Sequence, residues 1–235
     1  MSDPADKPAE QRPFYGAHAD AYDLLITDPV EPWVEAVHER VGRGSILDAG
    51  CGTGRHAAAL IARGHEVDLA DASAELLAQA RARCPSSQAY RVDLRSMVLP
   101  RRYAAVTCRG VLNDLISDDD RDAALRAMAG CLQPGGLLLL DVREAQGSRV
   151  RADGRPRSRT VDGLTFTATT TWRDGLLDVE EEYASPEGRS GFQFTMRPWT
   201  EEELRARLGW AGFGVVDIGA GVGRRTKDRL FVVAA

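Results

Sequence analysis

The sequence predicts an α/β fold with a doubly wound, mostly parallel sheet, and three observations support this prediction. Short apolar runs alternate with segments of helical periodicity from residue 45 to residue 141. Each interval between runs is long enough for a right-handed crossover, which makes consecutive strands parallel. The first run is followed by glycine at positions 50, 52 and 54. A strand-to-helix turn without side chains at three points lets a ligand touch the backbone in front of a helix N-terminus.

The N-terminal part of the chain is expected to lie outside the sheet. Residues 1–12 are polar and rich in proline and charge, so we expect them to be disordered. Residues 13–235 have the length and apolar content of one α/β domain. Within that domain, residues 13–44 are expected to form a helical lid. Its second helix covers about Glu31–Arg40, where apolar residues recur at helical spacing.

The sheet is expected to contain seven strands. A helix over Arg121–Leu132 precedes the fifth strand and stops at a Gln-Pro-Gly-Gly sequence. Thr200 is a typical N-cap for the last helix, because three glutamates follow it. The sixth and seventh strands are expected at Gly214–Ile218 and Arg229–Ala234. The first five are expected at Ser45–Ala49, Glu66–Ala70, Ala89–Val92, Ala104–Cys108 and Gly136–Asp141.

A different pattern separates the fifth strand from the last helix. Gly147–Arg159 is rich in arginine and is expected to be an exposed loop. Three runs with period-two alternation follow it, at Leu164–Trp172, Leu176–Tyr183 and Gly191–Trp199. Glycine-containing turns separate these runs, which favours hairpins. We therefore expect residues 160–199 to form an inserted antiparallel β meander with one packed face and one wetter face.

Composition excludes several classes of function. The formal net charge of −5 gives no electrostatic basis for binding a nucleic acid. No apolar run approaches the roughly 18 residues of a membrane span. The four cysteines lack any C-x-x-C pair and the four histidines lack metal-ligand spacing, so we expect no metal site. Unpaired, scattered cysteines indicate reduced thiols and a cytoplasmic protein.

The turn after the first strand resembles motif I of the class I S-adenosylmethionine-dependent methyltransferases. Its sequence is Asp-Ala-Gly-Cys-Gly-Thr-Gly over residues 48–54, with an acid already on the strand. A dinucleotide fingerprint instead has its third glycine one residue later and its acid about twenty residues on. The resemblance covers about residues 15–235 and implies a Rossmann-like fold that binds S-adenosylmethionine and releases S-adenosylhomocysteine. The cofactor contacts that it implies in this turn are Asp48, Ala49, Gly50, Cys51, Gly52 and Gly54.

The same resemblance assigns cofactor residues at the ends of the next two strands. Asp71, followed by Ala72, matches the acid that accepts hydrogen bonds from both ribose hydroxyls, and a carboxylate suits that task. Asp68 is a rival by composition, but it lies three residues earlier, inside the strand. Asp93, followed by Leu94, matches the acid that accepts from the adenine amino group. Taken alone, Asp93 is equally consistent with the cap of a turn.

The segment after the fourth strand is expected to contact the methionine part of the cofactor and the acceptor. In the family, a backbone carbonyl near Arg109 receives the methionine ammonium group. Related small-molecule N-methyltransferases place a histidine near the position of Asp114, so the aspartate here departs from their pattern. We expect Asp114 to accept a proton from the acceptor or to hold its cation, with Asn113 contacting the acceptor. The alternative is that both residues cap a helix.

Aromatic residues of the lid are candidates for covering the site. Tyr22 lies in a segment that resembles the entry helix of small-molecule methyltransferases, whose tyrosine closes over the sulfonium end of the cofactor. Tyr15 is a candidate acceptor contact in the same lid. The alternative is that these aromatics simply pack on the sheet. Arg143 lies at the carboxyl end of a strand, and Arg197 is placed to hold an acceptor carboxylate or to pair with the acidic face of the meander.

The sequence therefore predicts transfer of a methyl group from S-adenosylmethionine to a small molecule. An amine acceptor is preferred, from the resemblance to amino-sugar and secondary-metabolite enzymes such as those of antibiotic biosynthesis. A hydroxyl or carbon acceptor is the second choice. A third possibility is a member of the fold that binds the cofactor without methylating. The exposed meander makes a homodimer the expected assembly.

Overall fold

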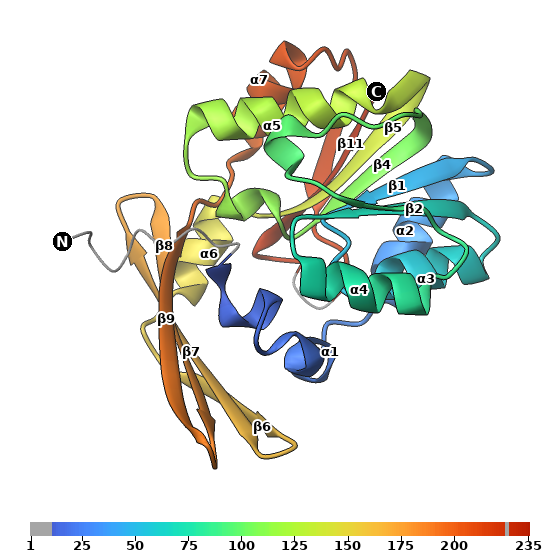
Figure 1. Ribbon diagram of the computed structural model, residues 1–235. Coiled ribbons are helices and arrows are strands. Elements are labelled where there is room, and N and C mark those ends of the chain that lie inside the picture. The colour runs from blue at the N-terminus through green and yellow to red at the C-terminus, as the bar shows by residue number, and fades with distance from the viewer. Residues whose placement is uncertain (1–10, 224–225) are drawn as a thin grey trace.

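The computed structural model describes residues 11–223 and 226–235, and its main body is a seven-stranded sheet with helices on both faces (Figure 1). The strand order is β10-β11-β5-β4-β1-β2-β3. Neighbouring strands from β3 to β5 are parallel, and β11 runs antiparallel to both β5 and β10. The predicted mostly parallel α/β fold is confirmed. The strands are β1 (Ser45–Ala49), β2 (Glu66–Asp71), β3 (Ala89–Arg91), β4 (Tyr103–Arg109), β5 (Leu132–Arg143), β10 (Val216–Ala220) and β11 (Arg229–Ala234).

Two groups of helices cover the two faces of this sheet (Figure 1). Apolar residues of α5 and α7 pack with one face, and those of α2, α3 and α4 pack with the other. The bounds of these helices are α2 (Glu31–Val41), α3 (Arg55–Ala62), α4 (Ala74–Arg83), α5 (Asp118–Gly130) and α7 (Glu201–Trp210).

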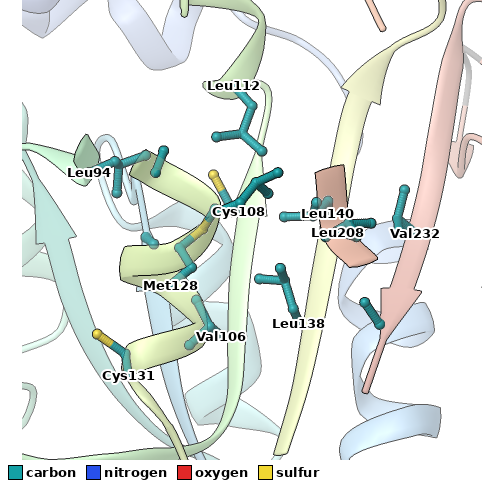
Figure 2. Packing of buried hydrophobic residues seen from close by; sticks show 14 of the residues in the cluster. Leu94, Val106, Cys108, Leu112, Met128, Cys131, Leu138, Leu140, Leu208 and Val232 are labelled. Atoms are coloured by element: carbon teal, nitrogen blue, oxygen red, sulfur yellow. The ribbon is translucent and has the colours of Figure 1, made fainter. Parts of the chain in front are cut away.

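The central strands are buried on both faces, because helices cover each face and successive side chains of a strand point to opposite faces. In β5, Leu138 and Leu140 pack toward α5 and α7, whereas Leu139 joins the cluster on the other face. Figure 2 shows Leu138 and Leu140 beside Val106 of β4, with Met128 of α5 packed against them. Near-continuous apolar strands of this kind are typical of parallel sheets covered by helices.

The strand order reverses between β1 and β4. From β1 the chain proceeds outward through β2 and β3, and then crosses back to place β4 on the other side of β1. In open α/β sheets, the crevice outside the carboxyl ends of the strands at such a switch point is where ligands bind. The glycine turn follows β1, and residues 110–115 follow β4, so both segments lie at this crevice.

The inserted segment forms a second sheet of four antiparallel strands in the order β6-β7-β8-β9. The expected loop over 147–159 is wrong, because α6 (Ala145–Arg151) and β6 occupy most of it. Strand β6 pairs with β7 in an antiparallel ladder, and two pairs of hydroxyl groups add bonds across it, Ser158 with Thr167 and Thr160 with Thr165, each 2.8 Å apart. The strands are β6 (Arg157–Val161), β7 (Leu164–Arg173), β8 (Leu176–Ser185) and β9 (Gly188–Met196).

The first part of the predicted lid, residues 13–26, packs against this second sheet, whereas its second helix, α2, packs against the first sheet. Phe14 is fully buried, and its ring centroid lies 4.9 Å from that of Phe166 and 5.8 Å from that of Tyr183. Residues 1–10, most of the segment expected to be disordered, lie outside the described residues. The short helical turns of the lid are η3 (Pro13–Tyr15), η4 (Ala19–Ala21) and α1 (Tyr22–Leu25), and two more such turns follow β3 and β4, η5 (Leu94–Ser96) and η6 (Leu112–Asp114).

Candidate functional site

The three glycines of the turn after β1 have different tasks. All three have positive φ, between 56° and 76°. A Cβ added at Gly50 would lie 2.4 Å from Cγ2 of Val111, and one at Gly54 would lie 3.1 Å from Cα of Ala80. Both glycines therefore serve close packing inside the protein. At Gly52 nothing lies within 4 Å of that position, so its backbone is open to a ligand.

Asp71 stands at the end of β2 and is bonded to the glycine turn. Its Oδ2 accepts from the backbone N–H of Gly52 at 2.8 Å, and its Oδ1 accepts from that of Ser73 at 2.9 Å. Burial raises the pKa of Asp71, and these N–H donors act in the opposite direction. Its rival, Asp68, is buried within the sheet, where its two oxygens accept from Gln88 N–H and Tyr103 O–H. The geometry therefore favours Asp71 over Asp68 as the acid at the crevice.

Asp48 is a buried link between β1 and β4. Thr107 of β4 donates its hydroxyl hydrogen to Asp48 Oδ1 at 2.9 Å. Burial raises the pKa of Asp48 to about 6, against the effect of this hydrogen bond. The neighbouring Ala49 and Cys51 are also buried, and burial raises the pKa of the Cys51 thiol. Cys51 is therefore protonated at neutral pH, as suits a space-filling residue rather than a nucleophile.

Asp93 follows β3 and caps the turn η5. Its Oδ1 accepts from the backbone N–H of Arg95 at 2.8 Å, and the Arg95 side chain donates to both oxygens. This hydrogen bonding is the main cause of the lowered pKa of Asp93. Leu94 is buried in the core, and Ala72 after β2 is exposed. The contacts predicted for these three residues with the cofactor stay predictions.

The side chain of Arg109, at the end of β4, points into a charged cluster. Its Nε lies 3.6 Å from Asp141 Oδ2, and its terminal nitrogens lie 3.8 Å from Asp28 Oδ2 and 3.4 Å from His56 Nε2. Burial and nearby arginines lower the pKa of His56 to about 3, so the imidazole is neutral. Asp141 is fully buried and also pairs with Arg229. The role predicted for Arg109 concerns its backbone carbonyl and stays a prediction.

Two of the candidate acceptor contacts are engaged within the protein. Asn113 is fully buried, and its Oδ1 accepts from the backbone N–H of Arg143 at 2.8 Å. The guanidinium of Arg197 pairs with Asp118 at 2.6 Å and with Glu203 at 2.7 Å, instead of with the acidic face of the meander. Their contacts with an acceptor stay predictions, as does that of Arg143.

Tyr22 lies within electrostatic reach of both ends of the candidate site. The pKa of Tyr22 is raised, mainly by burial. The charges of Asp71 and Asp114 raise this pKa further, and the charge of Arg12 lowers it. Asp114 acts in the same way on the pKa of Tyr15, whose ring centroid lies 6.2 Å from that of Tyr22. The charge of Asp114 thus acts on both lid tyrosines, Tyr15 and Tyr22.

Several residues that sequence reasoning missed fasten the lid. Thr53 in the glycine turn donates its hydroxyl hydrogen to Asp23 Oδ1 of α1 at 2.6 Å, and Arg83 of α4 donates to the other oxygen at 2.6 Å. Arg12 pairs with Glu181 of β8. A signal for Glu181 existed in the sequence: its neighbours Glu180 and Glu182 share one face of the strand, so Glu181 must point to the apolar face.

The candidate site does not coincide with the depression on the second sheet. A depression of about 670 Å³ lies on the second sheet, but its lining runs from Pro156 to Gln193 and includes no residue of the glycine turn. We place the candidate site at the switch point, because the backbone opening and the buried titratable groups are there.

Within residues 11–223 and 226–235, no three His, Cys, Asp or Glu side chains are grouped to hold a metal ion. The same residues contain no helix long and apolar enough to span a membrane.

Comparison with known sequences finds one matching family and several relatives. The family is described as a methyltransferase domain and matches residues 46–136. The dTDP-3-amino-3,6-dideoxy-α-D-glucopyranose N,N-dimethyltransferase of Streptomyces fradiae is 36% identical over 98 residues, which cover 41% of this chain and 38% of that protein. The match spans between about two fifths and just over half of the length of these curated relatives.

Solved structures with a similar fold match nearly the whole chain. An S-adenosylmethionine-dependent methyltransferase from Clostridium acetobutylicum ATCC 824 has a TM-score of 0.80 at 19% identity, over 94% of this chain and 98% of that chain. CalS10, an amino pentose methyltransferase from Micromonospora echinaspora solved with S-adenosylmethionine bound, has a TM-score of 0.70 at 24% identity. That match covers 93% of this chain and 96% of CalS10. These likenesses establish the fold.

Proposed function

We propose that this protein transfers a methyl group from S-adenosylmethionine to an amine nitrogen of a small molecule. The proposal is supported by the match of residues 46–136 to a methyltransferase-domain family and by the fold, which solved S-adenosylmethionine-dependent methyltransferases share. The observation that carries the proposal is a convergence at one crevice. The glycine turn after β1, Asp71 at the end of β2 and Asp114 after β4 stand at the carboxyl ends of neighbouring strands, and the charges of Asp71 and Asp114 both raise the pKa of Tyr22.

The residues at the crevice fit this cofactor. The open backbone at Gly52 would face it, and Asp71 presents a carboxylate that is already oriented by two N–H donors. Such a carboxylate retains lone pairs for two ribose hydroxyls. Asp93 follows the next strand, β3, and would accept a hydrogen bond from the adenine amino group. When bound, the cofactor supplies an electrophilic methyl group on a sulfonium sulfur.

The protein's own residues have three tasks in such a reaction. Tyr15 and Tyr22 exclude water from the reacting end, because the lid that carries them is packed against the second sheet. The lid and the segment after β4 together orient the acceptor. Asp114 accepts the proton that an ammonium group must lose before its nitrogen can attack. The negative charge of Asp114 also favours a cationic acceptor over an anionic one.

The choice of nitrogen over oxygen rests on Asp114 and on the relatives. An ammonium group is a cation that a carboxylate can bind, and it is several pKa units more acidic than a sugar hydroxyl, so a carboxylate accepts its proton far more readily. Among the similar proteins, the Streptomyces fradiae enzyme acts on an amino sugar. We accordingly propose an amino sugar or a similar metabolite amine as the acceptor class.

The test is methyl transfer from S-adenosylmethionine labelled in the methyl group. The acceptors are nucleotide-linked amino sugars, each paired with the same sugar carrying a hydroxyl in place of the amine. We expect label on the amine member of at least one pair and none on its hydroxyl partner. Label on hydroxyls alone would move the assignment to O-methylation. Tight S-adenosylhomocysteine binding without product across the panel would favour a non-methylating member of the fold.

The cellular setting of this activity is also a proposal. The described cysteines are all free and buried, which supports a reducing, cytoplasmic environment. The similarity to an amino-sugar N,N-dimethyltransferase and to an amino pentose methyltransferase of calicheamicin biosynthesis supports a role in secondary metabolism such as antibiotic biosynthesis. The acidic net charge supports a small-molecule acceptor and no nucleic-acid partner. We propose a homodimer, because the second sheet projects from the main body (Figure 1). Light scattering at micromolar concentration tests this assembly directly.

A further inference from the structure

We propose that Arg12 and Glu181 form a latch that holds the lid, residues 13–25, closed over the candidate site. Arg12 is then a positioning residue for Tyr15 and Tyr22, and it does not itself touch the reacting atoms. The inference rests on the proposed function in one respect, because it takes the crevice under the lid to be the cofactor site. The existence of the latch itself can be tested without any cofactor.

The contact between the two side chains is bidentate and directional. Arg12 Nε donates to Glu181 Oε2 at 3.2 Å, and a terminal nitrogen of Arg12 donates to Oε1. The other terminal nitrogen donates to the hydroxyl oxygen of Tyr15 at 2.9 Å. The guanidinium carbon also lies 4.4 Å from the ring centroid of Phe194 and 4.9 Å from that of Tyr15. Planar pairing and stacking of this kind fix the orientation of an arginine, which a lysine would not reproduce.

The burial of Glu181 makes this contact consequential. Only 4% of Glu181 is exposed, and Tyr183 donates its hydroxyl hydrogen to Oε2 at 2.7 Å. A buried carboxylate that loses its cationic partner is left uncompensated, which costs far more than the loss of a surface ion pair. The buried Glu181 therefore strongly favours the arrangement in which Arg12 is paired with it, and this arrangement keeps the lid closed.

The lid connects this latch to the crevice. Tyr15 is the third residue after Arg12, and its backbone oxygen accepts from Ser73 Oγ at 2.6 Å. Ser73 lies two residues after Asp71 in the chain. The ring of Phe14 contacts that of Tyr22, with centroids 5.4 Å apart. Release of Arg12 would thus free the segment that places Tyr15 and Tyr22.

The other end of the lid is fixed independently. Arg55 donates to the backbone oxygens of Ile26 and Asp28 at 2.6 and 2.8 Å. Asp23 is held by Thr53 and Arg83 on the main body. Because residues 23–28 have several bonds to the first sheet and its helices, the lid is expected to open from the Arg12 end and to turn about this fixed end.

The experiment compares four variants. Arg12→Gln and Glu181→Gln each break the latch, and the double variant Arg12→Glu with Glu181→Arg restores opposite charges in reversed order. Arg173→Gln is the matched control, because it removes an arginine–carboxylate pair, Arg173 with Asp178, whose two members both belong to the second sheet. Hydrogen–deuterium exchange of a peptide over residues 13–25 is measured without cofactor, and S-adenosylhomocysteine affinity is measured by calorimetry.

In each single variant, we expect exchange in residues 13–25 to be about tenfold faster or more, while β4 and β5 keep wild-type protection. The dissociation constant for S-adenosylhomocysteine should rise about five- to twentyfold, because the apparent affinity falls with the fraction of molecules whose lid is closed. The double variant should recover part of both losses, and Arg173→Gln should match the wild type.

Three outcomes separate the possibilities. If residues 13–25 of Arg12→Gln exchange at the wild-type rate, the latch is overturned. This variant decides the matter even if Glu181→Gln disturbs the second sheet, because Arg12 lies outside that sheet. Tighter binding of an amine to Arg12→Gln, with exchange unchanged, would instead make Arg12 a cation that blocks the acceptor site. If the wild type fails to bind S-adenosylhomocysteine, the proposed function fails, and the exchange data still judge the latch.

Discussion

The carboxylate of Asp71 accepts a hydrogen bond from the backbone N–H of Gly52, with 2.8 Å between N and Oδ2. This bond ties the end of β2 to the turn after β1, across the edge of the sheet where a ligand would lie. Ser73 N–H holds the other oxygen at 2.9 Å. The carboxylate is therefore oriented before any ligand arrives, which lowers the ordering cost of binding.

Replacement of Asp71 by alanine should weaken the binding of S-adenosylhomocysteine. The variant removes an acceptor for two hydroxyl groups, and hydrogen bonds to a charged group contribute about 1.5–3 kcal/mol. That loss corresponds to a roughly 10- to 150-fold higher dissociation constant, measured by calorimetry at pH 7.5.

Asp217→Ala is the matched control, because Asp217 is exposed on the edge strand β10. It should bind S-adenosylhomocysteine with wild-type affinity. Equal affinities for Asp71→Ala and the wild type would remove the ribose assignment, and with it the main link between the crevice and this cofactor.

Replacement of Asp114 by asparagine should lower turnover far more than cofactor affinity. The amide keeps the shape of the carboxylate but neither accepts a proton nor carries a charge. Loss of a general base typically costs about 10²–10⁴-fold in rate. Turnover is measured at saturating cofactor across pH 6–9, with cofactor affinity measured in parallel.

Asp119→Asn serves as the control for this substitution, because Asp119 is exposed in the first turn of α5. Its turnover should match that of the wild type. If Asp114→Asn turns over normally at every pH in this range, the proton leaves by another route. A raised KM for the acceptor with normal kcat would leave Asp114 as a cation anchor only.

Much of the fold could be predicted from the sequence because the signals that specify it are local. The apolar runs and the glycine turn gave the central strands within a few residues. Thr200 was expected to cap the last helix, and its hydroxyl accepts from the backbone N–H of Glu203 at 3.1 Å. Asp71 was expected directly after the second strand, and the structure has it as the last residue of β2. Asp114 was chosen by resemblance, and it lies in η6, five residues after β4 ends.

The missed features depend on partners that lie far apart in the chain. Arg12 and Glu181 are 169 residues apart, and no local pattern links them. Most of strand β6 was expected to be loop because its arginines lack an apolar alternation, whereas the strand forms by pairing with the backbone of β7, with two hydroxyl pairs across it. Arg197 was a candidate for an acceptor carboxylate, yet Asp118 and Glu203, which face it only in the folded protein, already hold it.

Substitutions at Tyr22 should separate the aromatic ring from the hydroxyl group. Tyr22→Ala removes a ring that packs against Phe14 and Tyr15, so we expect turnover to fall about 10- to 100-fold through loss of water exclusion and of contact with the cationic cofactor. Tyr22→Phe keeps the ring and should fall less than tenfold. Turnover of both variants is measured at saturating cofactor.

The pH dependence provides a further check on Tyr22. Burial raises the pKa of its phenol, so the hydroxyl stays neutral between pH 6 and 9. The ratio of the Tyr22→Phe rate to the wild-type rate should therefore be constant across this range. A ratio that changes with pH would show that the phenol titrates during turnover. Normal turnover by Tyr22→Ala would reduce the lid aromatics to a packing role.

Replacement of Asp48 by asparagine should stabilise the protein at neutral pH. The pKa of Asp48 is about 6, above the roughly 3.9 of an aspartate in an unfolded chain. Between these two values the folded protein binds more protons than the unfolded one, so the contribution of Asp48 to stability falls as pH rises through this window. Above pH 6 the full cost of the buried charge is present. Asparagine removes that charge and keeps an acceptor for the Thr107 hydroxyl.

The free energy of unfolding of Asp48→Asn should exceed that of the wild type by about 1–3 kcal/mol at pH 7.5. The difference should shrink toward zero near pH 4, where Asp48 is protonated in the folded protein. Urea unfolding of both proteins at several pH values measures it, with Asp217→Asn as an exposed control. A variant less stable than the wild type at pH 7.5 would mean that the Asp48 charge is more than compensated in the folded protein. In that case the carboxylate would hold β1 and β4 together at the switch point as an anion, and S-adenosylhomocysteine affinity should fall together with stability.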